Sequence, residues 1–429
     1  MLLDLTFLLK IMFSIRLKPF VQRFKKSTFE KNFSMRTLAN QDFSNQRAVV
    51  RVDFNVPIDD EFHVTDSTRI TAAKETIDYI LKQCGSCVLI SHLGRPKGKD
   101  PKLSLINIVK KVEEILGVSV SFFPDCVGAE AEKATADLQP GSVMLMENLR
   151  FYAEETAGDL AFAEGLSKLG DCYVNDAFGT AHRAHASTTI IAQFFNENKF
   201  FGLLLEKEVK AIEKVMKSGE KPVLAILGGA KVSSKITIIE NMLDKIDHLI
   251  IGGGMVYTFA KAQGGSVGQS ICEEDYCDYA LELLKKAKAK GVEVHLPTDV
   301  IIADDFSNDA NQKVCKVGEI PDDWEGLDAG PDTLKSFEDV VMQSKTILWN
   351  GPLGVFEFEN FSKGTIALGE HIAKSTAAGA FSLVGGGDSV SAVKQFGFED
   401  KMSYISTGGG AMLESLEGKT LPGIAALME

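Results

Sequence analysis

The sequence predicts an α/β fold with two doubly wound parallel-sheet (Rossmann-like) domains joined by a hinge helix. Short apolar runs recur along the chain, and each is followed by a polar or glycine motif and then by a segment with helical periodicity. Apolar strands that alternate with helices form parallel sheets covered on both faces. Because the chain has 429 residues, 45% of them hydrophobic, it is too long for one core, and two domains are expected.

Nine apolar runs are the expected strands. In chain order they are residues 48–54, 87–90, 143–146, 172–174, 223–227, 248–251, 346–349, 381–384 and 404–405. Ligands of doubly wound sheets bind beyond the carboxyl ends of the strands. The polar motifs of this chain follow these runs. They are therefore expected to gather at the edge of each sheet where its strands have their carboxyl ends, which is called the rim of that sheet.

A strong amphipathic helix is expected at residues 202–218. Its apolar residues stand at positions 204, 205, 209, 212 and 215, and a break follows at 219–222. All nine arginines of the chain lie at or before Arg183, just ahead of this helix, whereas 28 of the 38 glycines follow Arg183. Guanidinium groups suit phosphate and carboxylate, and glycines let backbone N–H groups approach a polyphosphate. The helix therefore joins an anion-binding half to a nucleotide-binding half.

The overall charge and the cysteines exclude several classes of protein. A formal net charge of -13 argues against general nucleic-acid binding, which needs a dense cationic surface. Seven scattered cysteines indicate a reducing compartment rather than a disulfide framework. Cys84 and Cys87 have zinc-site spacing, but no second pair or histidine follows at zinc-finger distance, so the spacing is interpreted as incidental.

Residues 1–34 differ in composition from the rest of the chain. They carry seven Lys and Arg residues against Asp4 and Glu30, and their apolar stretch is interrupted and too short to span a membrane. Two interpretations remain open for this basic leader. It is either a targeting segment for an organelle or a stretch that is not translated, with Met35 as the start.

In the second half, residues 221–235 predict a strand, a double glycine and then Lys231 and Lys235. If a helix begins near Ala230, both ammonium groups share one face and reach phosphates above the helix N-terminus. The alternative is an ordinary turn with two surface lysines. Three glycine triplets, each after an apolar strand, favour the phosphate site: 252–254, 385–387 and 408–410. Asp388 fits either a Mg²⁺ ligand or a helix N-cap.

In the first half, charged and amide groups stand where apolar runs end. They belong to the segments 51–57, 91–96, 147–150 and 175–185. A single arginine would be an ordinary surface ion pair, but repetition at strand ends indicates an anion site. For His182 and His185, anion contact or a structural hydrogen bond is preferred over metal ligation, because no cysteine or carboxylate cluster accompanies them.

Taken together, these motifs resemble the phosphoglycerate kinase family. The matching segments, in the family's order, are RVDFNVP from Arg51, SHLGRP from Ser91, ENLRF from Glu147, NDAFGTAHRAH from Asn175, LGGAKV from Leu227, IGGGM from Ile251, WNGPLGVFEF from Trp349, GGGDS from Gly385 and STGGGA from Ser406. The resemblance covers about residue 35 to the C-terminus. It implies reversible, Mg²⁺-dependent phosphoryl transfer between 1,3-bisphosphoglycerate and ADP, giving 3-phosphoglycerate and ATP, in glycolysis and gluconeogenesis.

The resemblance also implies site residues by motif. The substrate would be bound by Asp53, Phe54, Asn55, Arg69, His92, Leu93, Gly94, Arg95, Arg150 and Arg183. The nucleotide would be bound by Lys231, Lys235, Gly326, Glu357, Gly386, Gly387, Asp388 and Ser389, where the family usually has Thr at Ser389. Catalytic roles would fall to Arg69, Lys231, Gly386 and Gly409, and Asp388 would be the metal ligand.

The domain division follows from the same resemblance. Residues 35–201 together with the returning tail 411–429 would form the phosphoglycerate-binding domain, 202–218 the hinge helix, and 219–410 the nucleotide-binding domain. The resemblance further implies a cytoplasmic, hinge-bending monomer without nucleic-acid or membrane partners. Two rival functions stay open at this point: a kinase that acts on the carboxylate of an amino acid, and a catalytically dead nucleotide-binding protein.

Overall fold

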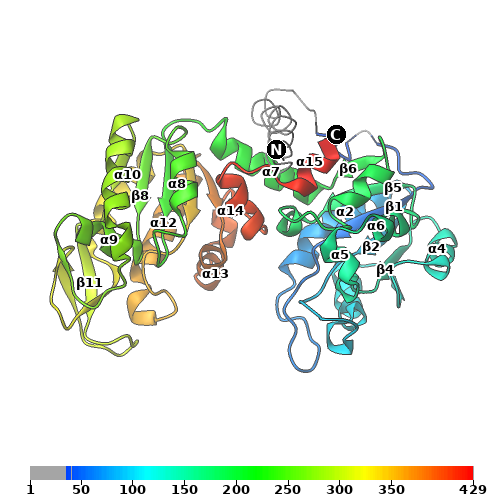
Figure 1. Ribbon diagram of the computed structural model, residues 1–429, viewed down its shortest axis with the longest axis horizontal. Coiled ribbons are helices and arrows are strands. Elements are labelled where there is room, and N and C mark those ends of the chain that lie inside the picture. The colour runs from blue at the N-terminus through cyan, green and yellow to red at the C-terminus, as the bar shows by residue number, and fades with distance from the viewer. Residues whose placement is uncertain (1–34, 40, 429) are drawn as a thin grey trace, which may run out of the picture.

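The computed structural model describes residues 35–39 and 41–428 and contains two six-stranded parallel sheets, one on either side of a long helix (Figure 1). The predicted α/β class with two parallel-sheet domains is confirmed. The basic leader at 1–34 lies outside the described residues. Within the described part of the chain, no helix is both long enough and apolar enough to cross a membrane.

The N-terminal sheet has the strand order β3-β4-β2-β1-β5-β6. Its strands are β1 (Arg47–Val52), β2 (Ser86–Ile90), β3 (Val120–Phe123), β4 (Val143–Met146), β5 (Cys172–Asp176) and β6 (Lys199–Phe201). One face packs on α2 (Thr68–Lys82) and α3 (Val109–Leu116), and the other on α4 (Ala129–Ala136) and α6 (Leu160–Ser167). In β1, Ala48 and Val50 point to the first face and Val49 to the second, so both faces are apolar, as in other parallel sheets.

The C-terminal sheet has the order β10-β8-β7-β15-β16-β17. Its strands are β7 (Val223–Leu227), β8 (His248–Ile251), β10 (Glu293–His295), β15 (Thr346–Asn350), β16 (Phe381–Val384) and β17 (Tyr404–Ile405). The helices α8 (Ile236–Met242), α9 (Met255–Ala262) and α10 (Cys277–Ala289) pack on one face. The other face is covered by α11 (Pro331–Gln343), α12 (Lys363–Ala377) and α13 (Gly387–Gln395).

Each of the nine predicted runs contains a strand, but the sequence analysis missed eight others. Two small sheets lie beside the C-terminal sheet, formed by β11 (Asp299–Ala303), β12 (Gln312–Lys316) and β14 (Glu325–Ala329), and by β9 (Ser266–Val267) and β13 (Glu319–Ile320). The other missed strands, β3, β6 and β10, are all edge strands of the large sheets. These strands are short, and β9, β10 and β12 expose polar residues, so no apolar run marks those three. In contrast, β11 has the apolar run 300–303, which the sequence analysis did not recognise.

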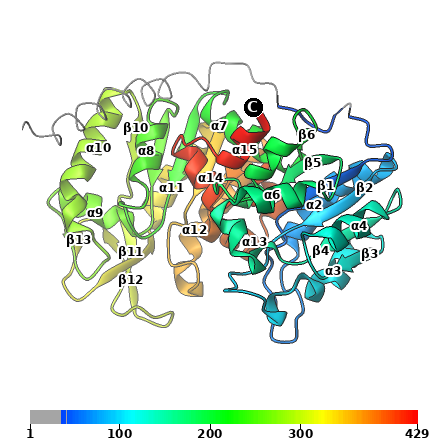
Figure 2. The ribbon, with the colours of Figure 1, turned by 45° about the vertical axis from the view of Figure 1, so that its right-hand side comes forward.

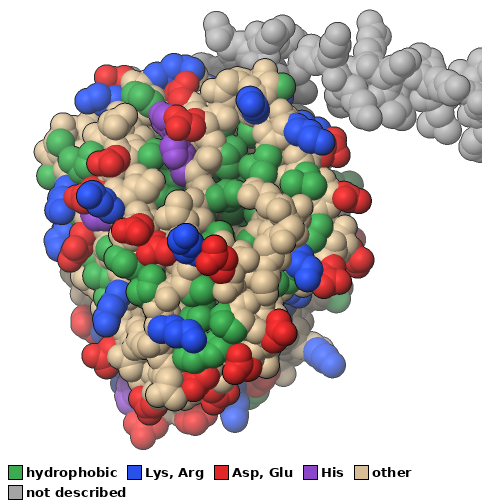
Figure 3. Space-filling view, turned by 90° about the vertical axis from the view of Figure 1, so that its left-hand side faces the viewer, with side chains coloured by type: hydrophobic (Ala, Val, Ile, Leu, Met, Phe, Trp, Pro, Cys, Tyr) green, Lys and Arg blue, Asp and Glu red, His purple; other side chains and the backbone are tan. Residues whose placement is uncertain are grey.

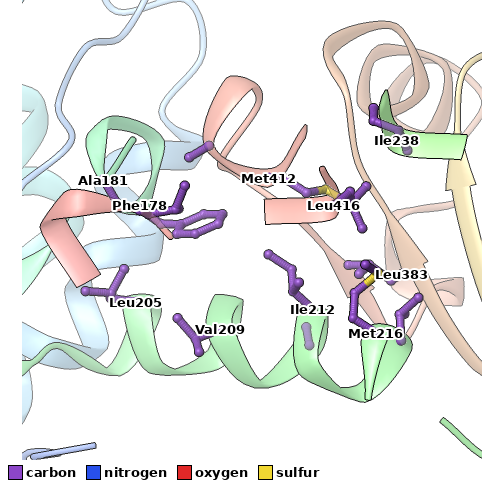
Figure 4. Packing of buried hydrophobic residues seen from close by; sticks show 14 of the residues in the cluster. Phe178, Ala181, Leu205, Val209, Ile212, Met216, Ile238, Leu383, Met412 and Leu416 are labelled. Carbon is purple, nitrogen blue, oxygen red and sulfur yellow. The ribbon is translucent and has the colours of Figure 1, made fainter. Parts of the chain in front are cut away.

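The hinge helix predicted at 202–218 is present as α7 (Leu203–Met216). Its apolar stripe lies in one hydrophobic cluster that continues from the N-terminal sheet into the C-terminal sheet (Figure 4). The labelled members of this cluster are Phe178, Ala181, Leu205, Val209, Ile212, Met216, Ile238, Leu383, Met412 and Leu416. The helix therefore packs into both cores and is not a free linker.

The start of α7 is fixed by a buried carboxylate at the end of β5. Asp176 is fully buried, and its Oδ1 accepts the N–H groups of Leu204 (2.9 Å) and Leu205 (3.2 Å). A Cβ at Gly202 would overlap this carboxylate, so only glycine fits there. Burial raises the pKa of Asp176 to about 6, although Thr76 and the two helix N–H groups favour the charged form.

The C-terminal tail runs between the two sheets before it reaches the N-terminal side (Figure 2). The helix α14 (Gly410–Leu416) contacts α7, α8 and the 178–180 turn, and α15 (Pro422–Met428) contacts β6 and the 190–194 turn. Only α15 thus packs wholly on the N-terminal side. The boundary at residue 411 remains a prediction.

The buried carboxyl of Asp176 should make stability depend on pH. Its pKa is raised on folding, so stability is highest when Asp176 is protonated and falls as pH rises from about 4, where the unfolded carboxyl titrates, to about 6. Over that window the wild type should lose about 3 kcal/mol relative to Asp176→Asn, at about 1.4 kcal/mol for each pKa unit. Urea unfolding followed by circular dichroism at pH 4 to 7 measures the difference.

Asp171→Asn is the matched control for this prediction. Hydrogen bonds from Arg47 lower the pKa of Asp171, so its stabilising contribution is present at neutral pH and lost as pH falls. The two variants should therefore differ from the wild type with opposite pH slopes. Equal slopes would show that Asp176 is not a protonated buried group at low pH.

Candidate active site

The rim of the N-terminal sheet is built around a buried arginine. Arg51 lies near the end of β1 with no exposed surface, and its Nε donates to Ser187 Oγ at 2.9 Å. Its guanidinium also donates to the carbonyl of Val52 and lies 3.2 Å from His92 Nδ1. Glu155, buried as well, accepts from the N–H (3.0 Å) and hydroxyl (2.7 Å) of Ser187. The sequence grouped Arg51 with the anion-binding arginines, but the structure places it beneath the rim as a support.

Asp53, Asn55 and Arg69 meet at the end of β1. Arg69, in the first turn of α2, donates from Nη1 to the carbonyl of Asn55 at 2.9 Å and lies 3.3 Å from Asp53 Oδ2. The Asn55 Oδ1 accepts the N–H of Gly94 at 2.8 Å, which ties this loop to the loop after β2. These contacts fix the direction in which the guanidinium of Arg69 points.

His92 and Arg150 stand in a field of positive charge. Burial, followed by the neighbouring charges of Arg51, Arg150 and Arg69, lowers the pKa of His92 well below its usual value, so the imidazole is neutral at physiological pH. Burial together with Arg51 and Arg183 lowers the pKa of Arg150 to about 10. A cation that is destabilised by its cationic neighbours is stabilised when an anion binds. The rim is therefore suited to a carboxylate or phosphate ligand.

The other predicted substrate residues fall into two groups. Arg95 and Arg183 are exposed, so their guanidinium groups are accessible to a ligand. The side chains of Phe54 and Leu93 are buried in the hydrophobic core under the rim, so these residues offer a ligand only their main chains. Arg150 lies between the groups, half-buried, and donates from Nη1 to the carbonyl of Gly94 at 2.6 Å.

In the C-terminal rim, the expected helix near Ala230 is wrong. The helix α8 begins at Ile236, and Lys231 and Lys235 lie on the turn before it. Glu273 holds this turn open, because its carboxylate accepts the N–H (2.9 Å) and the hydroxyl (2.6 Å) of Ser233. Ser234 Oγ donates to the carbonyl of Lys231 at 2.8 Å, and such a local serine bond favours a turn over a helix. The two lysines therefore do not share a helical face, and Lys231 is exposed while Lys235 is half-buried.

Lys235 is positioned by Asn350 at the end of β15. The ammonium group donates to Asn350 Oδ1, and Asn350 Nδ2 donates to the carbonyl of Gly385 at 2.6 Å. Burial lowers the pKa of Lys235, and the nearby charge of Asp388 partly offsets that effect. Asp388 is exposed in the first turn of α13. The adjacent Ser389 is buried, and its Oγ accepts the N–H of Gly351 at 2.5 Å.

The glycine triplets serve two different purposes. A Cβ at Gly253 would lie 2.7 Å from the backbone nitrogen of Gly229, and one at Gly385 would overlap the sulfur of Met412. These glycines permit close packing of protein against protein. At Gly387 and Gly409 a Cβ would meet no atom within 4 Å, so the main chain there is open to a ligand.

Gly326 and Glu357 lie farther out on the C-terminal domain. Gly326, on β14, backs onto the buried ring of Tyr257, whose hydroxyl leaves no room for a Cβ, and its N–H donates to Ser270 Oγ at 2.9 Å. Tyr257 lines a pocket with Gly252, Gly253, Val256, Pro297, Val300, Asp328, Ala329 and Leu353. Glu357 is exposed and is not among these lining residues.

The two rims are connected by direct contacts. Lys394 of α13 donates to Asp66 Oδ2 and to Thr68 Oγ1, both at 2.7 Å, one turn before Arg69. The loop 408–410 belongs to the C-terminal half but packs on the N-terminal side, because a Cβ at Gly408 would overlap the ring of Phe178. The structure thus brings Gly409 next to the N-terminal rim.

Several residues of the site were missed by the sequence analysis. Asn350, Tyr257 and Lys394 carry no pattern of their own, although Asn350 lies in the quoted segment that begins at Trp349. Glu155 and Ser187 were missed as partners of a buried arginine. An arginine within an apolar strand is the one signal that could have pointed to them, since a buried charge needs partners.

Comparisons with known proteins agree on one family. A family model described as phosphoglycerate kinase matches residues 38–419. A phosphoglycerate kinase of Porphyromonas gingivalis is 54% identical over 415 residues, which cover 91% of this chain and 99% of that protein. A cytosolic phosphoglycerate kinase of Nicotiana tabacum is 52% identical over 394 residues, 92% of this chain and 98% of that protein. The solved structure of phosphoglycerate kinase from Coxiella burnetii aligns with a TM-score of 0.84 at 40% identity, covering 92% and 99% of the two chains.

The supporting role of Arg51 can be tested by substitution. In Arg51→Lys the ammonium group cannot replace the guanidinium fork, so partners such as Ser187 and His92 lose hydrogen bonds in a buried setting. The free energy of unfolding should fall by about 2–3 kcal/mol. Arg47→Lys, at the other end of β1, weakens a partly exposed pair with Asp171 and should cost under about 1 kcal/mol. Urea midpoints measure both; equal losses would mean that Arg51 is not a structural arginine.

Proposed function

The chain belongs to the phosphoglycerate kinase family, and we propose that its two connected rims divide the reaction of that family between them. The protein is a phosphotransferase, and its reaction is the reversible transfer of a phosphoryl group between 1,3-bisphosphoglycerate and ADP, a step of glycolysis. The N-terminal rim would bind the phosphoglycerate and the C-terminal rim the nucleotide. The observation that carries this division is the concentration of positive charge around His92 and Arg150 on the N-terminal rim.

On the N-terminal rim, Arg150, Arg183 and Arg95 would grip the phosphate and carboxylate of the substrate. Arg183 is close enough to Arg150 to disfavour its charge, so an anion bound between them would remove the repulsion. The neutral imidazole of His92 would donate or accept a hydrogen bond at the carboxyl end of β2. Asp53 would orient Arg69, with which it forms an ion pair at 3.3 Å.

On the C-terminal rim, Lys231 and Lys235 would neutralise nucleotide phosphates, and the main chain of Gly386 and of Gly387, which is open, would donate to them. We propose Mg²⁺ as the accompanying cation, with Asp388 as its protein ligand. An exposed carboxylate beside a phosphate site fits this ion, which favours one or two carboxylates plus phosphate oxygens. Bound Mg²⁺ would supply charge neutralisation at the phosphates. Gly326 and Glu357 would flank the base and the ribose, respectively.

The chemistry needs no general acid or base. The leaving group of an acyl phosphate is a carboxylate, and in the reverse direction a carboxylate attacks without losing a proton. Catalysis then depends on positioning and on neutralising charge in the transition state. Arg69 and Lys231 would stabilise the phosphoryl group in flight, with Gly386 and Gly409 offering backbone N–H groups. Bringing the rims together excludes the water that would hydrolyse the acyl phosphate.

We further propose a cytoplasmic, hinge-bending monomer. All seven cysteines are free, as expected in a reducing compartment. Bending is supported by the way the contacts are distributed: α7 runs through both cores, whereas the rims meet through a small number of polar contacts such as that of Lys394.

A coupled spectrophotometric assay with 3-phosphoglycerate and MgATP tests the proposed function. Turnover is expected with this pair. An amino-acid kinase would turn over only when 3-phosphoglycerate is replaced by an amino acid, and a dead nucleotide-binding protein would bind ATP without turnover. Either of those results would replace the proposal.

The role of Lys231 has a kinetic signature. In Lys231→Ala, kcat should fall roughly 100-fold or more, in line with the loss of one transition-state contact, while the nucleotide KM changes less than about threefold. Lys288→Ala, on the exposed face of α10, is the control and should behave as wild type. A near-normal kcat for Lys231→Ala would remove this lysine from the chemistry.

The contact between the rims should favour closure. In Lys394→Met the bonds to Asp66 and Thr68 are lost, so kcat/KM should fall roughly two- to fivefold, as for a partly exposed pair. Raising the salt concentration should shrink the gap between wild type and variant. Lys374→Met breaks a pair with Glu338 inside the C-terminal domain and should leave kcat/KM unchanged. Identical effects of the two substitutions would argue against a role of Lys394 in closure.

A further inference from the structure

A second cluster of ligand-type side chains lies on the outer edge of the C-terminal sheet, away from both rims. His248 is the first residue of β8, and Glu293 and His295 belong to the edge strand β10. Figure 3 shows this side of the molecule, where histidine side chains reach the surface next to an acidic one. Of the residues described, these three form the group whose ligand atoms all lie within 4.8 Å of one another.

The parallel register explains why the three side chains converge. Glu293 pairs with His248, and His295 pairs with Ile250. Because side chains alternate along a strand, Glu293 and His295 point to the same face of the sheet, and His248 points to that face from the next strand. Val294, between them, packs with Leu249 on the opposite face. The backbone thus holds the cluster in place without any loop.

The spacing of the ligand atoms matches a tetrahedral metal site. His248 Nδ1 lies 3.1 Å from His295 Nε2 and 3.5 Å from the Glu293 carboxylate. Ligands about 2.0–2.1 Å from a tetrahedral Zn²⁺ are about 3.3 Å from one another. The two distances from His248 Nδ1 fall on either side of that value, and the third pair of ligand atoms lies within 4.8 Å, so the three atoms are close enough to share one ion.

Hydrogen bonding alone leaves this cluster incompletely satisfied. When His295 Nε2 donates to His248 Nδ1, that nitrogen has no proton left for the Glu293 carboxylate. When His248 Nδ1 carries the proton instead, only one of its two neighbours can accept it at full strength. Three electron-pair donors therefore converge on a space with one shared proton. A divalent cation satisfies all three at once.

The surroundings also suit a cation. Asp247, next to His248, adds negative charge, although Lys221 pairs with it at 2.8 Å. Glu293 is 68% exposed, so its carboxylate can adjust to the ion.

We propose that His248 Nδ1, His295 Nε2 and the carboxylate of Glu293 bind a divalent transition-metal ion of the Zn²⁺ class, with water as the fourth ligand. Two imidazoles and one carboxylate favour such an ion over Mg²⁺, which prefers oxygen ligands. The site lies away from the C-terminal rim. His248 is the first residue of β8, whereas Gly252 to Gly254 follow the last residue of that strand, at the rim. Its effect is to fasten the three-residue edge strand β10 to β8. The proposal is independent of the kinase reaction.

A Co²⁺ titration of the full chain tests the site. The experiment uses nucleotide-free protein with millimolar Mg²⁺, which occupies the Asp388 carboxylate. Visible absorption bands of low-symmetry Co²⁺ are expected, without the near-ultraviolet bands of thiolate ligation, and Zn²⁺ should abolish them at one equivalent. Saturating Zn²⁺ should also raise Tm, because the ion binds the folded state. Thiolate bands, or no saturable binding, would overturn the proposal.

Variants locate the ligands. Zn²⁺ affinity measured by calorimetry should fall at least tenfold in His295→Gln and in Glu293→Gln. His63→Asn is the control, because His63 lies 3.4 Å from Asp59 and 3.7 Å from Glu61 but has no second histidine, and its affinity should equal that of the wild type. Measuring Tm in the presence of a chelator reveals whether His295→Gln lowers the stability of the metal-free protein. Glu293 is exposed, so Glu293→Gln tests the site even in that case. Unchanged affinity in Glu293→Gln and His295→Gln would refute the assignment.

Discussion

The shared core around α7 is the constraint on which the rest of the structure depends. One hydrophobic cluster begins on a face of the N-terminal sheet, runs along α7 and α14, and ends on a face of the C-terminal sheet. Burial of apolar surface is the dominant favourable contribution to folding, so the same packing that stabilises each domain also attaches both domains to α7. Buried hydrogen bonds add to this attachment. Glu208, buried in α7, accepts from Ser406 and Thr407 at 2.7–2.8 Å, and burial raises its pKa to about 7.

The two rims follow different physical designs. The N-terminal rim concentrates arginines over a buried network in which Glu155 offsets the charge of Arg51. Arg51 and Arg183 disfavour the charge of Arg150 at the surface of this rim, and Glu155 and Asp53 only partly offset that effect. The C-terminal rim uses few charges and relies on open backbone at Gly387 and Gly409, where N–H groups can approach phosphate. In both rims, buried contacts support the groups that stand at the surface.

The glycine triplets lie where the sequence predicts them, but the sequence explains only part of why glycine is needed at those positions. The triplets do stand at strand ends on one rim, as the sequence predicts. Part of each triplet, however, is small because protein packs against it: Gly253 meets Gly229, and Gly385 meets Met412. Close approach of two loops and close approach of a ligand demand the same residue, so only the three-dimensional neighbours distinguish the two causes.

The sequence alone determined the α/β class, the nine strands marked by apolar runs, the joining helix and the motifs on the rims, because periodicity and residue type are local properties. It could not give the edge strands such as β10, which carry no apolar run, or the true start of α8, which depends on Glu273 forty residues away. Tertiary structure decided that Arg51 is a buried support and that Arg150 is half-buried at the rim, and it brought His248 beside His295. Burial and partnership arise only when distant segments pack together, and no local pattern encodes them.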